Sequence, residues 1–205
     1  IEYAKMLYSR EAYIRIDMSE YRERHTISKI IGSPPGYVGY SENNYLLNKI
    51  KNNPYSVILI DEIEKAHPDV LKLFLQVFDD GFMTDSLGEV IDFRNTVIFM
   101  TSNLGTDINS IGFSNTNDVI VDKFKDFLGV EFVNRVDKFI YFEEIDDKTI
   151  NKIIKEQALG VGFLKSELSL EFLNRIKERS NYKEFGARHV SKVLREELGN
   201  KINNR

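Results

Sequence analysis

The sequence predicts an α/β fold with a parallel sheet, followed by a small and mostly helical domain. Two apolar runs, residues 57–60 and 96–101, each end at polar residues, which is typical of strands that are covered on both faces of a parallel sheet. Helical patterns separate these runs, and from residue 143 onward helices follow one another with little strand. We therefore expect a large α/β domain over residues 1–142 and a small helical domain over residues 143–205, a length that can bury a sizeable core.

The first third of the chain alternates helix, strand and loop. Apolar residues at helical spacing predict the end of a helix over residues 1–8, and alternation predicts a short strand over residues 12–17. A helix is expected over residues 20–31. It is followed by a loop over residues 32–40, because the prolines and glycines there cannot continue a helix. Residues 45–52 return to a helical pattern.

The elements that follow complete the sheet and then the helical domain. Pro68 begins a helix whose apolar stripe ends at Gly81, and a polar stretch over residues 107–118 precedes another helix that runs to Leu128. The apolar residues 139–142 predict a further strand. The small domain is expected to contain helices over residues 147–157, 169–179 and 187–202.

Composition excludes several classes of function. The chain has 28 Lys and Arg against 32 Asp and Glu, a net charge of -4, which argues against a nucleic-acid-binding arm or a polybasic membrane anchor. It has no cysteine, so disulfides, thiolate catalysis and cysteine-bound metals are excluded. No apolar run approaches the roughly 20 residues that span a bilayer. We expect no nucleic-acid partner and no membrane insertion.

Two acidic residues follow the first buried strand. Asp61 and Glu62 come directly after residues 57–60, at the carboxyl end of a strand, where ligands bind in parallel α/β sheets. One carboxylate could hold a metal while the other orients a water for phosphoryl transfer. The alternative is an acidic helix N-terminus, which stabilises the helix dipole. Asn103 follows the second strand and is either a neighbour of this site or a turn residue.

Together these segments resemble the second ATPase module of Clp-type AAA+ unfoldases. Residues 56–70, which contain the apolar strand and Asp61-Glu62, match the Walker B segment of that family. The other matching blocks occur in the family's order and cover almost the whole chain; they are residues 32–40, 92–96, 100–103, 131–135 and 186–188. The resemblance implies a P-loop NTPase-type sheet sandwiched by helices, with a small sensor 2 domain after it.

The resemblance also implies roles for individual residues, with ATP and Mg²⁺ as cofactors. Asp61 would help to hold the magnesium ion, and Glu62 would polarise the hydrolytic water. Asn103 matches sensor 1, which responds to the terminal phosphate. Arg135 matches the arginine finger, which completes the site of a neighbouring subunit. Arg188 matches sensor 2, by which the small domain responds to bound nucleotide. As alternatives, Arg135 could form a surface ion pair and Arg188 could be an ordinary residue at a helix end.

Two loops imply partners. Tyr37 and Val38, between glycines, resemble the axial pore loop that grips unfolded protein substrates in a homo-hexamer. Thr84 to Val90 resembles the second pore loop less specifically. The tripeptide Ile111-Gly112-Phe113 resembles the loop by which some Clp unfoldases dock on the ClpP protease ring, because two large apolar residues in a polar loop suit burial by a partner. The alternative is a loop that packs on its own domain.

The chain departs from the family at its start. The phosphate-binding pattern Gly-x-x-x-x-Gly-Lys-Ser/Thr occurs nowhere in it, although in the family this P-loop and its central strand lie just before the segment that begins at Ile1. We expect a parent protein that continues upstream and threads substrates into ClpP. The alternatives are a non-hydrolysing adaptor or structural subunit, and a ClpB-like disaggregase without a protease.

Amino-acid usage gives an indication of origin. Ile occurs 22 times, Asn 17 and Lys 17 times, against 5 Ala, which indicates an AT-rich genome because the favoured residues have AT-rich codons. With a ClpC-like chain, this bias suits a plastid stroma or the cytoplasm of an AT-rich bacterium.

Overall fold

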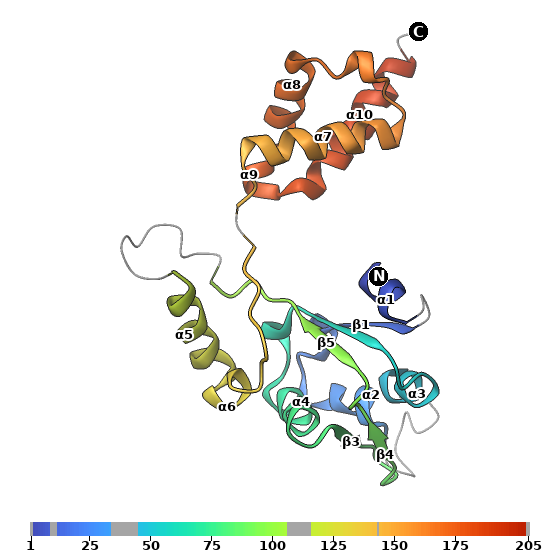
Figure 1. Cartoon of the computed structure of the whole chain (residues 1–205), viewed down its shortest axis with the longest axis vertical. Coiled ribbons are helices and arrows are strands. Elements are labelled where there is room, and N and C mark those ends of the chain that lie inside the picture. The colour runs from blue at the N-terminus through green and yellow to red at the C-terminus, as the bar shows by residue number, and fades with distance from the viewer. Residues whose placement is uncertain (1, 9–11, 34–44, 106–115, 143, 204–205) are drawn as a thin grey trace. The chain divides into compact units, whose positions relative to one another are not determined.

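A computed structural model describes residues 2–8, 12–33, 45–105, 116–142 and 144–203. The chain divides into two compact units, Ile1–Phe139 and Ile140–Arg205, each with its own hydrophobic core (Figure 1). The first unit contains the parallel sheet and the second is helical, so the predicted fold class is confirmed. No helix of the described residues is long and apolar enough to cross a membrane.

The sheet of the first unit has three parallel strands in the order β1-β2-β5. The central strand β2 (Val57–Asp61) lies between β1 (Tyr13–Asp17) and β5 (Val97–Met100). Along β1, buried side chains alternate with side chains that face outward, as the sequence pattern of residues 12–17 predicted. Because the strands are parallel, Asp17, Asp61 and Met100 end them at one edge of the sheet, which becomes the site described below.

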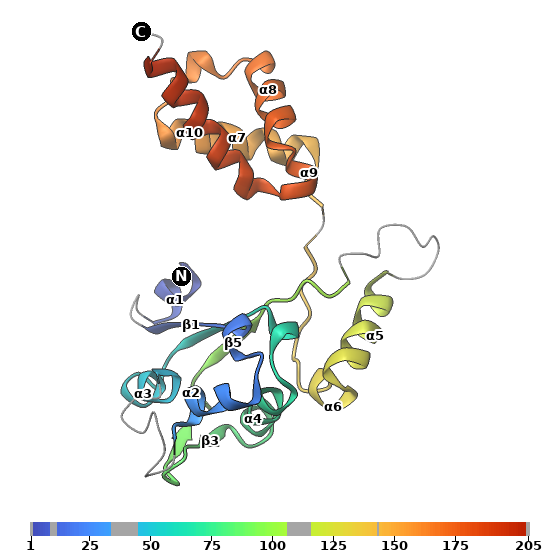
Figure 2. The ribbon, with the colours of Figure 1, turned by 180° about the vertical axis from the view of Figure 1, so that it is seen from behind.

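Helices α2 (Ser28–Ile31), α3 (Tyr45–Asn52) and α4 (Pro68–Asp80) belong to the same unit as the sheet (Figure 2). All three contribute buried side chains to the core that the sheet also fills. The start of α4 follows from its sequence. Pro68 occupies the first turn, and the His67 ring accepts a hydrogen bond from the Asp69 backbone N–H at 3.1 Å. Gly81 ends the helix with φ 77°, a left-handed conformation that favours glycine. Phe74, in the middle of α4, is completely buried.

A short hairpin follows α4 and was not predicted. Strands β3 (Phe82–Thr84) and β4 (Val90–Asp92) pair antiparallel, with Met83 and Ile91 buried. The Asp85 carboxylate closes the turn by accepting the backbone N–H groups of Leu87 and Glu89, each at 2.8 Å. Residues 84–90, expected as a second pore loop, therefore form the end of this hairpin.

The helix predicted over residues 20–31 is largely wrong. The chain forms two 3₁₀ turns, Met18–Tyr21 and Arg24–Ile27, and only then the single α-helical turn α2. Asp17 starts the first turn by accepting the Ser19 backbone N–H at 3.0 Å. This local bond competes with a continuous helix, since Asp and Ser side chains satisfy backbone groups in turns.

The strand predicted over residues 139–142 is also wrong, because these residues form neither helix nor strand. A strand requires a neighbour, and no described strand lies beside this segment. Ile140, Tyr141 and Phe142 remain exposed, Phe142 to 94%. Phe139 is half-buried, with its ring 5.7 Å from that of Phe124 between centroids. Before it, α5 (Thr116–Leu128) confirms the predicted helix, and α6 (Val130–Val133) adds one further turn. The end of a helix predicted over residues 1–8 is confirmed as α1 (Glu2–Leu7).

The second unit consists of α7 (Asp147–Val161), α8 (Leu170–Ser180), α9 (Tyr182–Phe185) and α10 (Ala187–Asn203), with a 3₁₀ turn at Lys165–Glu167. The three predicted helices are confirmed. Asp146 and Ser169 cap α7 and α8 by accepting backbone N–H groups one turn later. Buried residues of α7, α8, α9 and α10 form the core of this unit, and they include Ile150, Ile154, Phe172, Ile176, Val190 and Leu194.

Candidate active site

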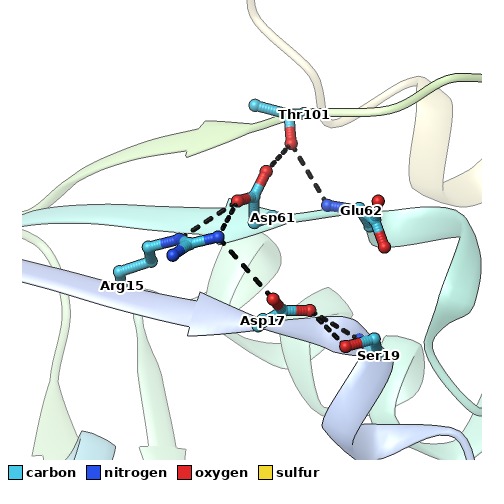
Figure 3. Close-up of polar contacts among 6 residues, drawn as sticks. All are labelled: Arg15, Asp17, Ser19, Asp61, Glu62 and Thr101. Carbon is cyan, nitrogen blue, oxygen red and sulfur yellow. Dashed lines mark hydrogen bonds and ion pairs between the residues drawn. The ribbon is translucent and has the colours of Figure 1, made fainter. Parts of the chain in front are cut away.

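The site lies at the carboxyl edge of the parallel sheet, where polar side chains follow neighbouring strands (Figure 3). Asp61 is the last residue of β2, and Thr101 comes directly after β5. The Thr101 hydroxyl donates to Oδ1 of Asp61. The adjacent ends of two strands are thus joined by a side-chain hydrogen bond at the position where parallel sheets bind ligands.

Glu62 has an unusual backbone conformation. Its φ of 54° and ψ of 55° lie in the left-handed region, which costs energy for a residue with a side chain. The turn is held by β5, because the Glu62 N–H donates to Thr101 Oγ1 at 3.1 Å and the Ile63 N–H donates to the Thr101 carbonyl at 3.0 Å. Strained residues of this kind cluster at functional sites.

Arg15 projects from β1 toward the other oxygen of Asp61 (Figure 3). Its Nε and one terminal nitrogen donate to Asp61 Oδ2 at 3.0 and 2.5 Å, and the same nitrogen lies 3.6 Å from Asp17 Oδ2. The hydrogen bond with Asp61 raises the pKa of the Arg15 guanidinium. Hydrogen bonds from the Ser19 hydroxyl and backbone N–H lower the pKa of Asp17. Asp17 therefore stays ionised near neutral pH beside a permanent cation.

Asn103 follows Thr101 by two residues and is exposed. Its backbone N–H donates to Glu64 Oε1 at 3.4 Å, a long hydrogen bond that links it to the turn after β2. The other Glu64 oxygen is buried and has no hydrogen-bond partner within the described part of the chain. Asp61, Glu62 and Asn103 are thus brought to one edge of the sheet.

Arg135 lies just beyond α6 and pairs with α4. Its Nε donates to Asp79 Oδ1 at 2.5 Å, and a terminal nitrogen donates to the Glu131 carbonyl at 3.2 Å. The hydrogen bond with Asp79 raises the pKa of the Arg135 guanidinium. An edge-to-face contact between Phe78 and Phe132, 5.3 Å between ring centroids, packs the two helices together beneath this pair.

The other predicted residues are not brought to this edge. Arg188 is exposed near the start of α10, in the second unit. Tyr37 and Val38 lie outside the described residues, as do Ile111, Gly112 and Phe113.

The donor set fits a magnesium ion. Mg²⁺ prefers oxygen ligands and is usually held by one or two carboxylates together with substrate phosphates and water. Asp61 supplies such a carboxylate beside the Thr101 hydroxyl. No cluster of three or more His, Cys, Asp or Glu side chains within the described residues could hold a metal ion by itself. Phosphate oxygens would have to complete the coordination.

Sequence reasoning missed Arg15 and Thr101. Thr101 stands within the matching block 100–103, in which the family resemblance implies a role for Asn103 alone. A hydroxyl residue directly after a strand that neighbours two acids was the available signal. For Arg15, the signal was an outward-facing position in the strand beside β2.

Comparison with known proteins identifies the family of the chain. The family described as AAA domain (Cdc48 subfamily) matches residues 2–139. The chain is 46% identical over 165 residues to the chloroplastic chaperone protein ClpB3 of Arabidopsis thaliana, covering 76% of this chain and 17% of that protein. It is 48% identical over 153 residues to the Clp protease ATP-binding subunit ClpE of Bacillus subtilis, covering 71% of this chain and 22% of that protein.

A solved structure shares the fold over the whole chain. A closed-state reconstruction of Hsp104 with ATPγS and FITC casein superposes with a TM-score of 0.83 and 32% identity, covering 100% of this chain and 38% of that one. The chain spans about a fifth of the length of the curated relatives described above. The matching family, the identity to these relatives and the shared fold show that the chain belongs to the AAA family, as a Clp-family AAA+ module.

Proposed function

We propose that this chain forms most of the second, C-terminal ATPase module of a ring-forming Clp unfoldase, with residues 1–142 as its large subdomain and 143–205 as its small one. The observation that carries the proposal is the joined edge of β2 and β5, where Asp61 and Glu62 lie beside Thr101 and Asn103. Adjacent acids of this kind can serve a metal and a water in phosphoryl transfer.

Each residue has a distinct task in this proposal. Asp61 holds Mg²⁺ together with the phosphates of ATP, and the ion neutralises charge that develops on them. Glu62 orients the attacking water, and Asn103 binds the terminal phosphate. Arg135 stabilises the transition state in the neighbouring subunit, while Arg188 carries the presence of nucleotide to the small subdomain.

The phosphate cradle must come from residues outside the 205. No Gly-x-x-x-x-Gly-Lys-Ser/Thr is present, and the backbone N–H groups and lysine of that loop have no substitute in the sequence. The position of β5 supports this proposal, because β5 is an edge strand of the described three-stranded sheet. A further strand beside β5 would carry such a loop to the same edge as Asp61.

The parent protein is proposed to form a homo-hexamer that pulls unfolded proteins through its centre. Tyr37 and Val38, flanked by Gly36 and Gly39, supply an aromatic grip that tolerates nearly any extended sequence. The likeness to Hsp104 with casein supports a protein substrate. Relatives from chloroplasts and bacteria support a plastid stroma or a bacterial cytoplasm as the location.

We further propose that the unfoldase feeds a ClpP-type protease through Ile111, Gly112 and Phe113. A second candidate is a ClpB-like disaggregase, which the similarity to ClpB3 and to Hsp104 favours. The two candidates differ in what buries the apolar pair Ile111 and Phe113. A protease ring would bury it in the first, whereas in the second the loop would pack on its own domain.

The test is ATP-dependent unfolding of a tailed green fluorescent protein by the full-length parent. Wild type should lose substrate fluorescence when ATP is added. Glu62→Gln should still bind ATP and assemble, but hydrolyse it at least about 100-fold more slowly and leave the fluorescence unchanged. Near wild-type turnover by Glu62→Gln would contradict the role of Glu62. A wild-type parent that does not hydrolyse ATP would favour the alternative of a non-hydrolysing adaptor or structural subunit.

A further inference from the structure

Thr101 binds four successive residues of the segment that carries the two acids. Its backbone N–H donates to the Ile60 carbonyl at 2.9 Å, and its own carbonyl accepts the Ile63 N–H at 3.0 Å. Between these, its hydroxyl donates to the Asp61 carboxylate and accepts the Glu62 N–H at 3.1 Å. Every polar group of Thr101 is therefore used on residues 60–63, and Figure 3 shows the two contacts of its hydroxyl.

We propose that Thr101 is a positioning residue for ATP hydrolysis, whose single hydroxyl sets the orientation of both Asp61 and Glu62. This inference rests on the proposed ATPase function and adds a residue to it. Thr101 touches neither nucleotide nor water in the proposal, and it acts through the two acids.

The effect on Asp61 follows from the division of its two oxygens. Oδ1 accepts from Thr101, and Oδ2 accepts from Arg15. Because both oxygens accept hydrogen bonds from opposite sides, the plane of the carboxylate is fixed. Without the hydroxyl, Oδ1 loses this donor while Arg15 still binds Oδ2, so the group can rotate toward the guanidinium and away from the ion that it would bind.

The effect on Glu62 passes through the backbone. At φ 54° this residue occupies a conformation that persists only where surrounding contacts maintain it. The Thr101 hydroxyl is the acceptor for the Glu62 N–H, so its removal leaves that N–H without its partner and loosens the turn. This turn sets the direction in which the Glu62 side chain leaves the backbone. When the turn loosens, the Glu62 carboxylate is no longer held in one orientation.

Three substitutions isolate the hydroxyl from the rest of the residue. Thr101→Val keeps the branched shape and both backbone hydrogen bonds but removes the hydroxyl, whereas Thr101→Ser keeps the hydroxyl. Thr96→Val is the matched control at the opposite end of β5, where the Thr96 hydroxyl donates to the Phe93 carbonyl at 2.7 Å. Thr101 is exposed, so none of its variants removes a core side chain.

The experiment compares these variants in the full-length parent, together with Glu62→Gln. Thr101→Val should lower kcat for ATP by about 10-fold or more, because it removes a hydrogen bond to a charged group, while the Kd for ATP without metal changes by less than about threefold. Thr101→Ser and Thr96→Val should stay within about threefold of wild type. As a second readout, Mn²⁺ binding in the presence of ATP, followed by electron paramagnetic resonance, should weaken in Thr101→Val and recover in Thr101→Ser.

The outcomes distinguish a failure of the role of Thr101 from a failure of the proposed ATPase function. If Glu62→Gln hydrolyses ATP like wild type, the proposed site itself is wrong. If Glu62→Gln is inactive but Thr101→Val retains wild-type kcat and Mn²⁺ binding, the role of Thr101 is overturned. It is equally overturned if Thr101→Ser is as impaired as Thr101→Val, since the defect then does not follow the hydroxyl. A melting temperature measured for each variant confirms that folded protein is compared.

Discussion

Arg135 and Asp79 form an ion pair of 2.5 Å that joins the residues after α6 to the last turn of α4. Both side chains are about one third exposed, at 33% and 38%, so the pair remains within reach of solvent. One terminal nitrogen donates to the Glu131 carbonyl, and the other lies 3.9 Å from a Glu131 carboxylate oxygen, which is beyond hydrogen-bond distance. These contacts use only part of a guanidinium, which has five N–H groups in all. Asp79 therefore holds the Nε side of the Arg135 guanidinium. N–H groups on the terminal nitrogens can still donate to a neighbouring subunit of the proposed ring.

Asp79→Asn should weaken the action of Arg135 without unfolding the protein. An exposed ion pair contributes about 0.2–1 kcal/mol, so we expect hydrolysis by the full-length parent to fall by no more than about fivefold. Asp80→Asn is the matched control, because Asp80 is the next carboxylate and forms no ion pair with a described residue. Equal effects of the two substitutions on the steady-state rate would show that only overall charge matters.

Arg135→Ala should abolish hydrolysis in a ring made only of the variant, because a residue that stabilises the transition state is absent from every site. In mixed rings, a variant subunit should still hydrolyse ATP when the neighbour that serves its site is wild type. The measurement is hydrolysis by rings of defined subunit order, in which Glu62→Gln silences selected sites. A variant subunit whose own site is dead, beside an active neighbour, would contradict action across the interface.

The 205-residue chain alone should bind ATP too weakly to detect at physiological concentrations. The chain contains the residues proposed to hold the metal and orient the water, but not the loop pattern that cradles phosphates. We also expect a monomer or a weak oligomer, because nucleotide bridges subunits in the proposed ring. Isothermal titration calorimetry and sedimentation test both expectations. Micromolar ATP binding by this chain would mean that another segment replaces the missing loop.

Phe113→Ala should separate protease coupling from ATP hydrolysis. A fully buried Phe side chain contributes about 1.5–3 kcal/mol, and repetition around a ring multiplies even a modest loss per loop. Degradation by ClpP should therefore collapse, while hydrolysis by the parent continues. Reduced thermal stability with undiminished ClpP association would instead indicate a loop that packs on its own domain, and it would favour the disaggregase.

The sequence predicted the elements whose burial and ends depend on local pattern. Strand β2 is a continuous apolar run, and α4 has its proline and its terminal glycine at the expected positions. The failures occur where a distant or competing partner decides. Residues 139–142 have strand-like side chains but no described strand beside them, and the bond between Asp17 and Ser19 replaces a helix by 3₁₀ turns.

The same distinction applies to the site. Asp61, Glu62 and Asn103 could be found because they follow apolar strands, and a sequence shows where a strand ends. The contacts of Arg15 and Thr101 depend on strand order and register, which bring β1 and β5 to opposite sides of β2. No pattern within a single strand contains that information.

The proposed catalytic acid, Glu62, has a left-handed backbone conformation that glycine would adopt with less strain. Selection for stability alone would replace this residue, since relief of the strain is worth about 1 kcal/mol. Glu62→Gly should therefore raise the melting temperature of the chain while it removes the carboxylate, whereas Glu62→Gln removes the charge and keeps the strain. If the proposed role is correct, glutamate at this position trades stability for activity, and the inactive glycine variant is the more stable protein.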